Sequence, residues 1–194
     1  LKVKNDWIKY KFMINYKSNI TKLYVCLGNV GKEYEQTRHN AGFLFGEKYI
    51  EQLHNSGNQM IIKEENLYKL VSFPQENISF LFPKTLMNLS GMAVNEYLSF
   101  TNKNFNIVVV HDDLDLILGD YKIIVGKGPK THNGLSSIED ALSTKDFERI
   151  RIGIENRNGL EISGLDYVLY RFSQEEMEKL NITLDKIIEL LNKE

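Results

Sequence analysis

The segment from Leu27 to Gly42 constrains this chain most, because an apolar run ends there on glycine and a polar cluster follows along the chain. The run Leu23–Leu27 is typical of a buried strand, and Gly28-Asn29 predicts the turn that ends it. The chain then reads Thr37-Arg38-His39-Asn40 at the start of a stretch with helical periodicity. A strand, a turn and a helix in this order place an imidazole and two carboxamides where a ligand can reach them.

Predicted strands and helices alternate along the rest of the chain. Together with a predicted hairpin around Pro74–Asn77, this order indicates a twisted mixed β-sheet in a single-domain three-layer α/β/α sandwich. No repeat, low-complexity tract or linker indicates a domain boundary within residues 21–194. The predicted strands are 23–27, 67–73, 78–82, 107–110, 121–125 and 149–154, and the predicted helices are 37–54, 89–100, 133–142 and 173–191.

Composition agrees with one globular domain, since the chain has 194 residues and 42% hydrophobic content. The single cysteine, Cys26, lies in the first predicted strand, which favours a small core residue in a reducing, cytoplasmic setting. No apolar run approaches the ~20 residues of a membrane-spanning helix. Residues 1–22 carry six lysines and one acid, whereas the whole chain has a net charge of −2. We interpret residues 1–20 as a Lys- and aromatic-rich extension, and net charge alone does not predict a polyanion partner.

Polar clusters follow several of the predicted strands. Because ligands bind at the carboxyl ends of strands in open α/β sheets, we expect clusters that are far apart in sequence to converge there. The clusters are Asn29 with Arg38-His39-Asn40, then 84–91, His111-Asp112-Asp113 and Thr131-His132-Asn133-Gly134.

The residue types in these clusters favour hydrolysis by activated water. An imidazole oriented by a carboxylate can act as a general base on water, and asparagine side chains can donate hydrogen bonds to an oxyanion. No serine or cysteine nucleophile accompanies the histidine. A metal centre built from His39, His111, Asp112 and Asp113 is the alternative. Their spacing, however, matches neither a His-Glu-x-x-His helix nor a Cys/His cluster.

Five motifs resemble those of the bacterial-type peptidyl-tRNA hydrolase family, in the family's order across residues 23–172. They are Leu-Gly-Asn-x-Gly-x-x-Tyr-x-x-Thr-Arg-His-Asn-x-Gly-Phe at 27–43, Lys-Thr-x-Met-Asn-x-Ser-Gly at 84–91, His-Asp-Asp-Leu-Asp-Leu at 111–116, His-Asn-Gly-Leu at 132–135 and Arg-Ile-Arg-Ile-Gly-Ile at 149–154. The resemblance implies hydrolysis of the ester between a peptide and the 3′ ribose of tRNA, without a metal or organic cofactor. It also implies a monomer that binds the acceptor stem and 3′ end of peptidyl-tRNA and needs no membrane or obligate protein partner.

The same resemblance implies roles for single residues. His39 would be the general base, Asp112 would orient it, and Asn29 would position the ester and stabilise the oxyanion. The implied substrate contacts are Asn88 with the peptide backbone, Asn133 with the substrate and the attacking water, Tyr34 and Met87 at the junction of adenosine and peptide, and Lys122 and Arg151 in a clamp on the tRNA phosphates.

The chain departs from the family pattern mainly around the implied clamp. Ile124 stands where a clamp lysine is common, and residues 126–131 lack the usual glycine-rich loop. Val30 replaces the proline that usually follows Gly-Asn. A last helical segment is missing after Glu194, which predicts a shortened lid over the tRNA side.

Simpler interpretations stand beside these assignments. Arg149 and Arg151 alternate with isoleucines, as they would on the solvent face of a strand. His111 and His132 are interpreted as packing residues beside functional neighbours. An RNA-binding relative that keeps the fold without catalysis is the alternative function.

Overall fold

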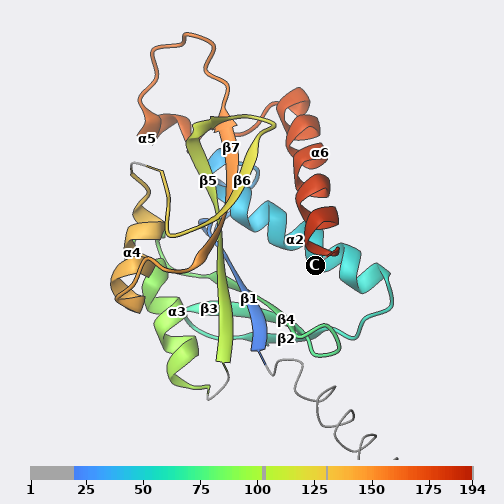
Figure 1. The fold of residues 1–194 in the computed structure, drawn as a ribbon. Coiled ribbons are helices and arrows are strands. Elements are labelled where there is room, and N and C mark those ends of the chain that lie inside the picture. Colours follow the sequence, from blue (N-terminus) through green and yellow to red (C-terminus); the bar gives the residue numbers. More distant parts are fainter. Residues whose placement is uncertain (1–19, 102–103, 130, 194) are drawn as a thin grey trace, which may run out of the picture.

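A computed structural model describes residues 20–101, 104–129 and 131–193, so that most of the predicted extension, residues 1–19, lies outside the described residues. The described strands form one sheet, and helices pack on it (Figure 1). They are β1 (Ile20–Cys26), η1 (Arg38–Asn40), α2 (Ala41–Asn55), β2 (Ile61–Glu64), β3 (Tyr68–Phe73), β4 (Ile78–Pro83), η2 (Met87–Leu89), α3 (Ser90–Ser99), β5 (Asn104–Ile117), β6 (Tyr121–Val125), α4 (Asn133–Leu142), β7 (Glu148–Glu155), α5 (Gly164–Tyr167) and α6 (Gln174–Leu191).

The sheet is mixed, as predicted. Its seven described strands lie in the order β2-β3-β4-β1-β5-β7-β6. The central strands β4, β1, β5 and β7 are parallel, whereas β2 and β3 at one edge and β6 at the other run antiparallel to their neighbours. The carboxyl ends of the parallel strands therefore lie along the same border of the sheet, perpendicular to the strands. The α/β topology favours a ligand site there.

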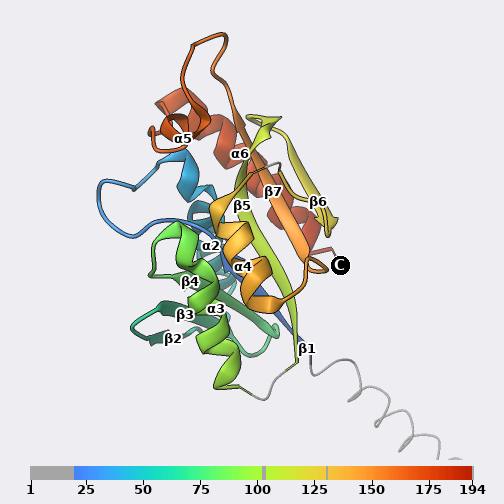
Figure 2. The same cartoon turned by 90° about the vertical axis from the view of Figure 1, so that its left-hand side faces the viewer.

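Alternating side chains of β1 pack into two separate cores on opposite faces of the sheet. Leu23 and Val25 join a core with residues of α3 and α4, whereas Tyr24 and Cys26 join one with residues of α2 and α6. Figures 1 and 2 show the two helix pairs on opposite sides of the strands. This is the predicted three-layer α/β/α sandwich. Burial raises the pKa of the Cys26 thiol well above its usual value, which fits a core residue.

The predicted strand 107–110 is too short, because β5 continues to Ile117. His111, Asp112 and Asp113 were expected in a loop but lie within the strand, where they pair in register with β7. These polar residues are buried. A strand can hold them there because their side chains find partners on other elements, so burial leaves few polar groups unsatisfied.

The predicted helix 37–54 starts differently in the structure. A 3-10 turn, η1, precedes α2, because the backbone N–H groups of Arg38 and His39 donate to Tyr170 and Val168 rather than staying free. The strand β2 and the short helix α5 were not predicted.

Within the described ranges, no helix has both the length and the apolar character needed to cross a membrane.

Candidate active site

The loop after β1 is tied to η1 by a pair of hydrogen bonds. The Asn40 side chain accepts from the Asn29 N–H at 2.8 Å and donates to the Asn29 carbonyl at 3.0 Å. Gly42 lets this segment lie directly on the sheet, since a Cβ there would stand 2.4 Å from the Val110 carbonyl oxygen. The Asn29 side chain and the His39 ring are thereby held beside the carboxyl end of β1.

His39 and Asp112 form the predicted pair. The His39 Nδ1 lies 2.9 Å from Asp112 Oδ1, and the two side chains are only 13% and 3% exposed. His132 Nε2 lies 3.0 Å from the same carboxylate oxygen. Since the Leu135 N–H donates to His132 Nδ1, His132 carries its proton on Nε2 and donates it to Asp112. His39 likewise donates from Nδ1, which leaves its Nε2 lone pair available to a reactant.

The charges at this centre reinforce one another. Burial alone would raise the pKa of Asp112, but His39 and His132 outweigh burial and hold the pKa of that carboxyl well below its usual range. Burial lowers the pKa of His39, and the charge and hydrogen bond of Asp112 more than offset it, so that the pKa lies above 6.5. Asp112 is therefore an anion that strengthens the basicity of His39.

His111 lies behind this pair and takes no direct part in it. Its Nδ1 donates to the Asp112 carbonyl oxygen at 2.7 Å, and its ring lies 4.9 Å from that of His132. Complete burial, with the nearby His132, lowers the pKa of His111 to about 3, so the ring is neutral. Its Nε2 has no hydrogen-bond partner among the described residues. The packing role predicted for His111 fits these contacts, whereas His132 also shares the Asp112 carboxylate.

The three residues could in principle hold a metal ion. His39, Asp112 and His132 offer ligand atoms that all lie within 4.8 Å of one another. In the structure, however, both imidazoles donate an N–H to the Asp112 carboxylate. Each of these hydrogen bonds would have to break before the donating nitrogen could bind a cation. Of the ligands considered from the sequence, His111 and Asp113 lie outside this group.

A cavity of about 260 Å³ opens beside His39. Asp112, His132 and Asn133 line its polar side, and Leu114, Leu165 and Val168 are among its apolar lining. The structure thus brings His39, Asp112 and Asn133 together, although they come from three separate segments. Asn29 lines another hollow instead, which has no described lining residue in common with this cavity.

The other predicted substrate residues are placed unequally. Met87 is buried, and a Cβ on Gly134 would meet its sulfur at 2.6 Å, so η2 packs on the start of α4 that carries Asn133. Asn88 is exposed beside Met87. Tyr34 is half-buried in the loop after β1 and lines neither the cavity beside His39 nor the hollow at Asn29.

The residues of the predicted clamp are cross-strand neighbours, with Lys122 on β6 opposite Arg151 on β7. Lys122 is exposed, whereas Arg151 is buried and its Nε donates to Asp113 Oδ2 at 2.5 Å. Arg149 is also buried and pairs with Glu139 at 3.0 Å. The interpretation of both arginines as a solvent face is therefore wrong, because acidic partners from β5 and α4 cover them.

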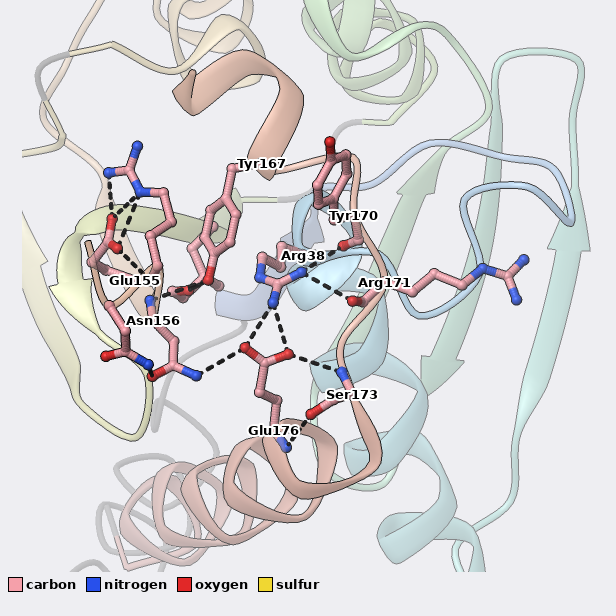
Figure 3. Close-up of polar contacts among 11 residues, drawn as sticks. Arg38, Glu155, Asn156, Tyr167, Tyr170, Arg171, Ser173 and Glu176 are labelled. Carbon is pink, nitrogen blue, oxygen red and sulfur yellow. Dashed lines mark hydrogen bonds and ion pairs between the residues drawn. The ribbon is translucent and has the colours of Figure 1, made fainter. Parts of the chain in front are cut away.

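Sequence reasoning missed the surroundings of Arg38, which Figure 3 shows in close-up. The buried Arg38 Nη2 donates to both carboxylate oxygens of Glu176 at 2.7 Å, and Nη1 donates to the carbonyls of Tyr170 and Arg171 at 3.0 Å. The guanidinium also lies 4.1 Å from the Tyr167 ring centroid. Arg38 thus joins the turn that carries His39 to α5 and α6. Only the adjacency of Arg38 to His39 could have indicated this.

The fold and the site define an α/β protein with a histidine–aspartate centre at the carboxyl edge of its parallel strands. Comparison with known proteins narrows this class. A peptidyl-tRNA hydrolase family model matches residues 23–193. The chain belongs to the peptidyl-tRNA hydrolase family.

Individual relatives match over most of their length. The peptidyl-tRNA hydrolase of Staphylococcus saprophyticus is 39% identical over 170 residues, which are 87% of this chain and 85% of that protein. That of Ligilactobacillus salivarius is 34% identical over 88% of this chain and 91% of its own. The crystal structure of peptidyl-tRNA hydrolase from Acinetobacter baumannii matches with a TM-score of 0.73 at 30% identity, covering 89% of this chain and 86% of that one.

Proposed function

We propose that the protein hydrolyses the ester bond between peptide and tRNA in peptidyl-tRNA, with His39 as the general base that activates water. The observation that carries this proposal is the 2.9 Å contact of His39 Nδ1 with Asp112 at the wall of a cavity, which leaves Nε2 free to accept a proton. Family membership supports the same substrate. The product tRNA would return to translation.

The reaction proceeds by addition of water to the ester carbonyl. His39 Nε2 takes a proton from the water as its oxygen attacks, and Asp112 stabilises the resulting imidazolium. The Asn29 carboxamide donates to the oxyanion of the tetrahedral intermediate, and Asn133 holds the attacking water. When the intermediate collapses, His39 returns the proton to the departing ribose oxygen. His132 keeps Asp112 in place through the shared oxygen.

The two halves of the substrate lie on different surfaces. Asn88 holds the peptide backbone, and Tyr34 and Met87 border the junction between adenosine and peptide. Lys122 and Arg151 bind the tRNA phosphates, Lys122 as an exposed cation and Arg151 from a position fixed by Asp113. The proposal further places the enzyme in the cytoplasm, as a monomer that needs no metal, organic cofactor or protein partner.

The test is hydrolysis of an N-blocked aminoacyl-tRNA by the wild type and His39→Ala under single-turnover conditions. We expect the rate to fall ~10²–10⁴-fold while tRNA binding stays within twofold, because the imidazole is needed for proton transfer alone. The unblocked aminoacyl-tRNA is the control substrate.

Three outcomes would contradict the proposal. Undiminished turnover by His39→Ala would remove His39 as the base. Tight RNA binding by the wild type without any hydrolysis would favour the RNA-binding relative. Activity that a chelator abolishes and added metal restores would favour a metal-dependent hydrolase at His39, Asp112 and His132.

A further inference from the structure

A groove leads away from Asn29 on the side of the molecule opposite Lys122. It consists of two hollows, of about 630 and 430 Å³, that share Val30, Phe43 and Glu47 in their walls. The first hollow starts at Asn29 and Asn40. The groove therefore begins at Asn29, the side chain to which the proposed reaction assigns the ester.

The second hollow lies between α2 and the edge strands β2 and β3, all of which contribute lining residues. Its floor is the α2-facing side of the sheet, where Ile62 of β2 lies opposite Val71 of β3. Val71 is buried in the core beneath α2, but Ile62 remains 52% exposed. Met60 and Phe82 add further apolar surface to the same hollow. An apolar floor that stays open in this way is suited to bind an apolar side chain.

The charges around the groove favour a peptide over RNA. The formal charges that line the two hollows balance, since they come from three glutamates and three lysines: Glu35, Glu47, Glu64, Lys32, Lys69 and Lys84. Lys84 is engaged with Glu64 at 3.3 Å and with the Glu65 carbonyl at 2.8 Å. A groove without excess positive charge has no electrostatic attraction for the phosphates of RNA, and it does not oppose a neutral peptide chain.

The sheet order separates the two ends of a substrate. β2 and β3 form one edge of the sheet, and β6, which carries Lys122, forms the other. A substrate whose ester lies at the carboxyl end of the central strand β1 can extend its tRNA toward β6 and its peptide toward β2. One cross-strand row of the groove lies near the carboxyl end of β4 and consists of Glu64, Lys69 and Phe82. This end of the groove is therefore on the same side of the sheet's strands as Asn29, which follows the carboxyl end of β1.

We propose that this groove binds the peptide part of peptidyl-tRNA, with an apolar side chain upstream of the esterified residue seated on Ile62, Val71 and Phe82. The inference rests on the proposed function, and it names a specificity that the His39 centre alone does not supply. Short peptides would end before they reach the second hollow, since each extended residue adds about 3.3 Å.

The test uses one matched pair of variants on β2. Ile62→Lys places a charge on the groove floor, whereas Ile61→Lys alters the neighbouring residue, which is 51% exposed and belongs to the opposite face of the strand. Three substrates are compared: an N-acetyl-aminoacyl-tRNA and two N-acetyl-pentapeptidyl-tRNAs with the same esterified residue, one rich in leucine and one rich in serine. KM and kcat are measured for each, with the thermal unfolding midpoint as the control for folding.

We expect Ile62→Lys to raise KM for the leucine-rich substrate about five- to tenfold, because one apolar contact is lost. KM for the serine-rich and single-residue substrates should change less than twofold, and Ile61→Lys should match the wild type throughout. Equal KM values for all three proteins, or an equal loss in both variants, would overturn the inference. So would a dimer of the wild type that Ile62→Lys dissociates at unchanged KM, since a second copy would then occupy the groove. If the wild type hydrolysed none of the substrates, the proposed function itself would fail.

Discussion

The His39 centre and the β6–β7 surface carry charge in different ways. At the centre, Asp112 accepts hydrogen bonds from the imidazoles of His39 and His132, which lie on separate segments. The side chains of His39 and Asp112 are both nearly excluded from solvent. On β6–β7, Lys122 is exposed and has no such partner among the described contacts, although its cross-strand neighbour Arg151 is buried and donates to Asp113. Buried, hydrogen-bonded charges depend on geometry, whereas exposed charges act through a screened field. Substitutions at the His39 centre should therefore change kcat. Substitutions of exposed charges on β6–β7 should change KM and its dependence on salt.

The largest effect is expected from Asp112→Asn, which removes the charge that both histidines contact. The hydrolysis rate should fall about 10²–10⁴-fold, because His39 loses its fixed tautomer and the partner of its imidazolium. Asp112 raises the pKa of His39 above 6.5, and a base must be deprotonated to act, so the wild-type rate should decline below that pKa.

In Asp112→Asn, burial acts on His39 without its counter-charge, and the acidic limb of the rate profile should move to lower pH. Single-turnover rates between pH 5 and 9 measure both effects. An acidic limb at the wild-type position would contradict the pairing.

Arg38→Met should have the next largest effect, since it leaves the Glu176 carboxylate without its main partner. Breaking a buried pair of this kind costs about 3–5 kcal/mol of unfolding free energy. We also expect kcat to fall about tenfold at constant KM, because η1 loses its tie to α6 and His39 shifts with it. Urea unfolding and steady-state kinetics at a temperature where the variant is folded provide the measurement.

Arg157→Met is the matched control for Arg38. Arg157 pairs with Glu155 and lies 5.4 Å from the same Tyr167 ring, but its described side-chain hydrogen bonds go to Glu155 and Ile162 rather than to η1. A fall in kcat of equal size in both variants would show that the effect is general loss of stability rather than positioning of His39.

Lys122→Met should produce a smaller effect, limited to binding. We expect KM for a 5′-phosphorylated substrate to rise about three- to tenfold, and the slope of log KM against log salt to decrease by about 1. Removal of the 5′-phosphate from the tRNA should abolish the difference from the wild type. Lys63→Met, which changes an exposed lysine on β2 at the other edge of the sheet, serves as the control. A rise in KM that persists without the phosphate would remove Lys122 from the proposed clamp.

The pairing of His39 with Asp112, which are 73 residues apart, was implied by the family resemblance. The sequence itself was sufficient to predict the sandwich, because apolar periodicity depends on local residues. It failed where a distant partner decides the outcome. The strand β5 continues through His111–Asp113 only because β7 pairs with it, and Arg151 is buried only because Asp113 accepts from it. Arg38 and Glu176 are 138 residues apart, so no local pattern could join them. β2 lacks the alternation that would reveal a strand, since its four residues are all exposed.

The smallest effect on activity is expected from His111→Asn. This substitution should, however, change how the free energy of unfolding depends on pH. The pKa of His111 is about 3 in the folded protein and near 6.5 when unfolded, so between these values the unfolded chain binds a proton that the folded protein does not. The free energy of unfolding contributed by His111 is complete above pH 6.5 and decreases by up to about 1.4 kcal/mol per pH unit below it. Urea unfolding of wild type and variant at pH 7.5, 6.0 and 5.0 should show the wild type losing stability more steeply. The difference between the two proteins isolates His111, because His39 and Asp112 titrate in both. Parallel curves would mean that His111 binds protons equally in the folded and unfolded states, so that burial does not lower its pKa.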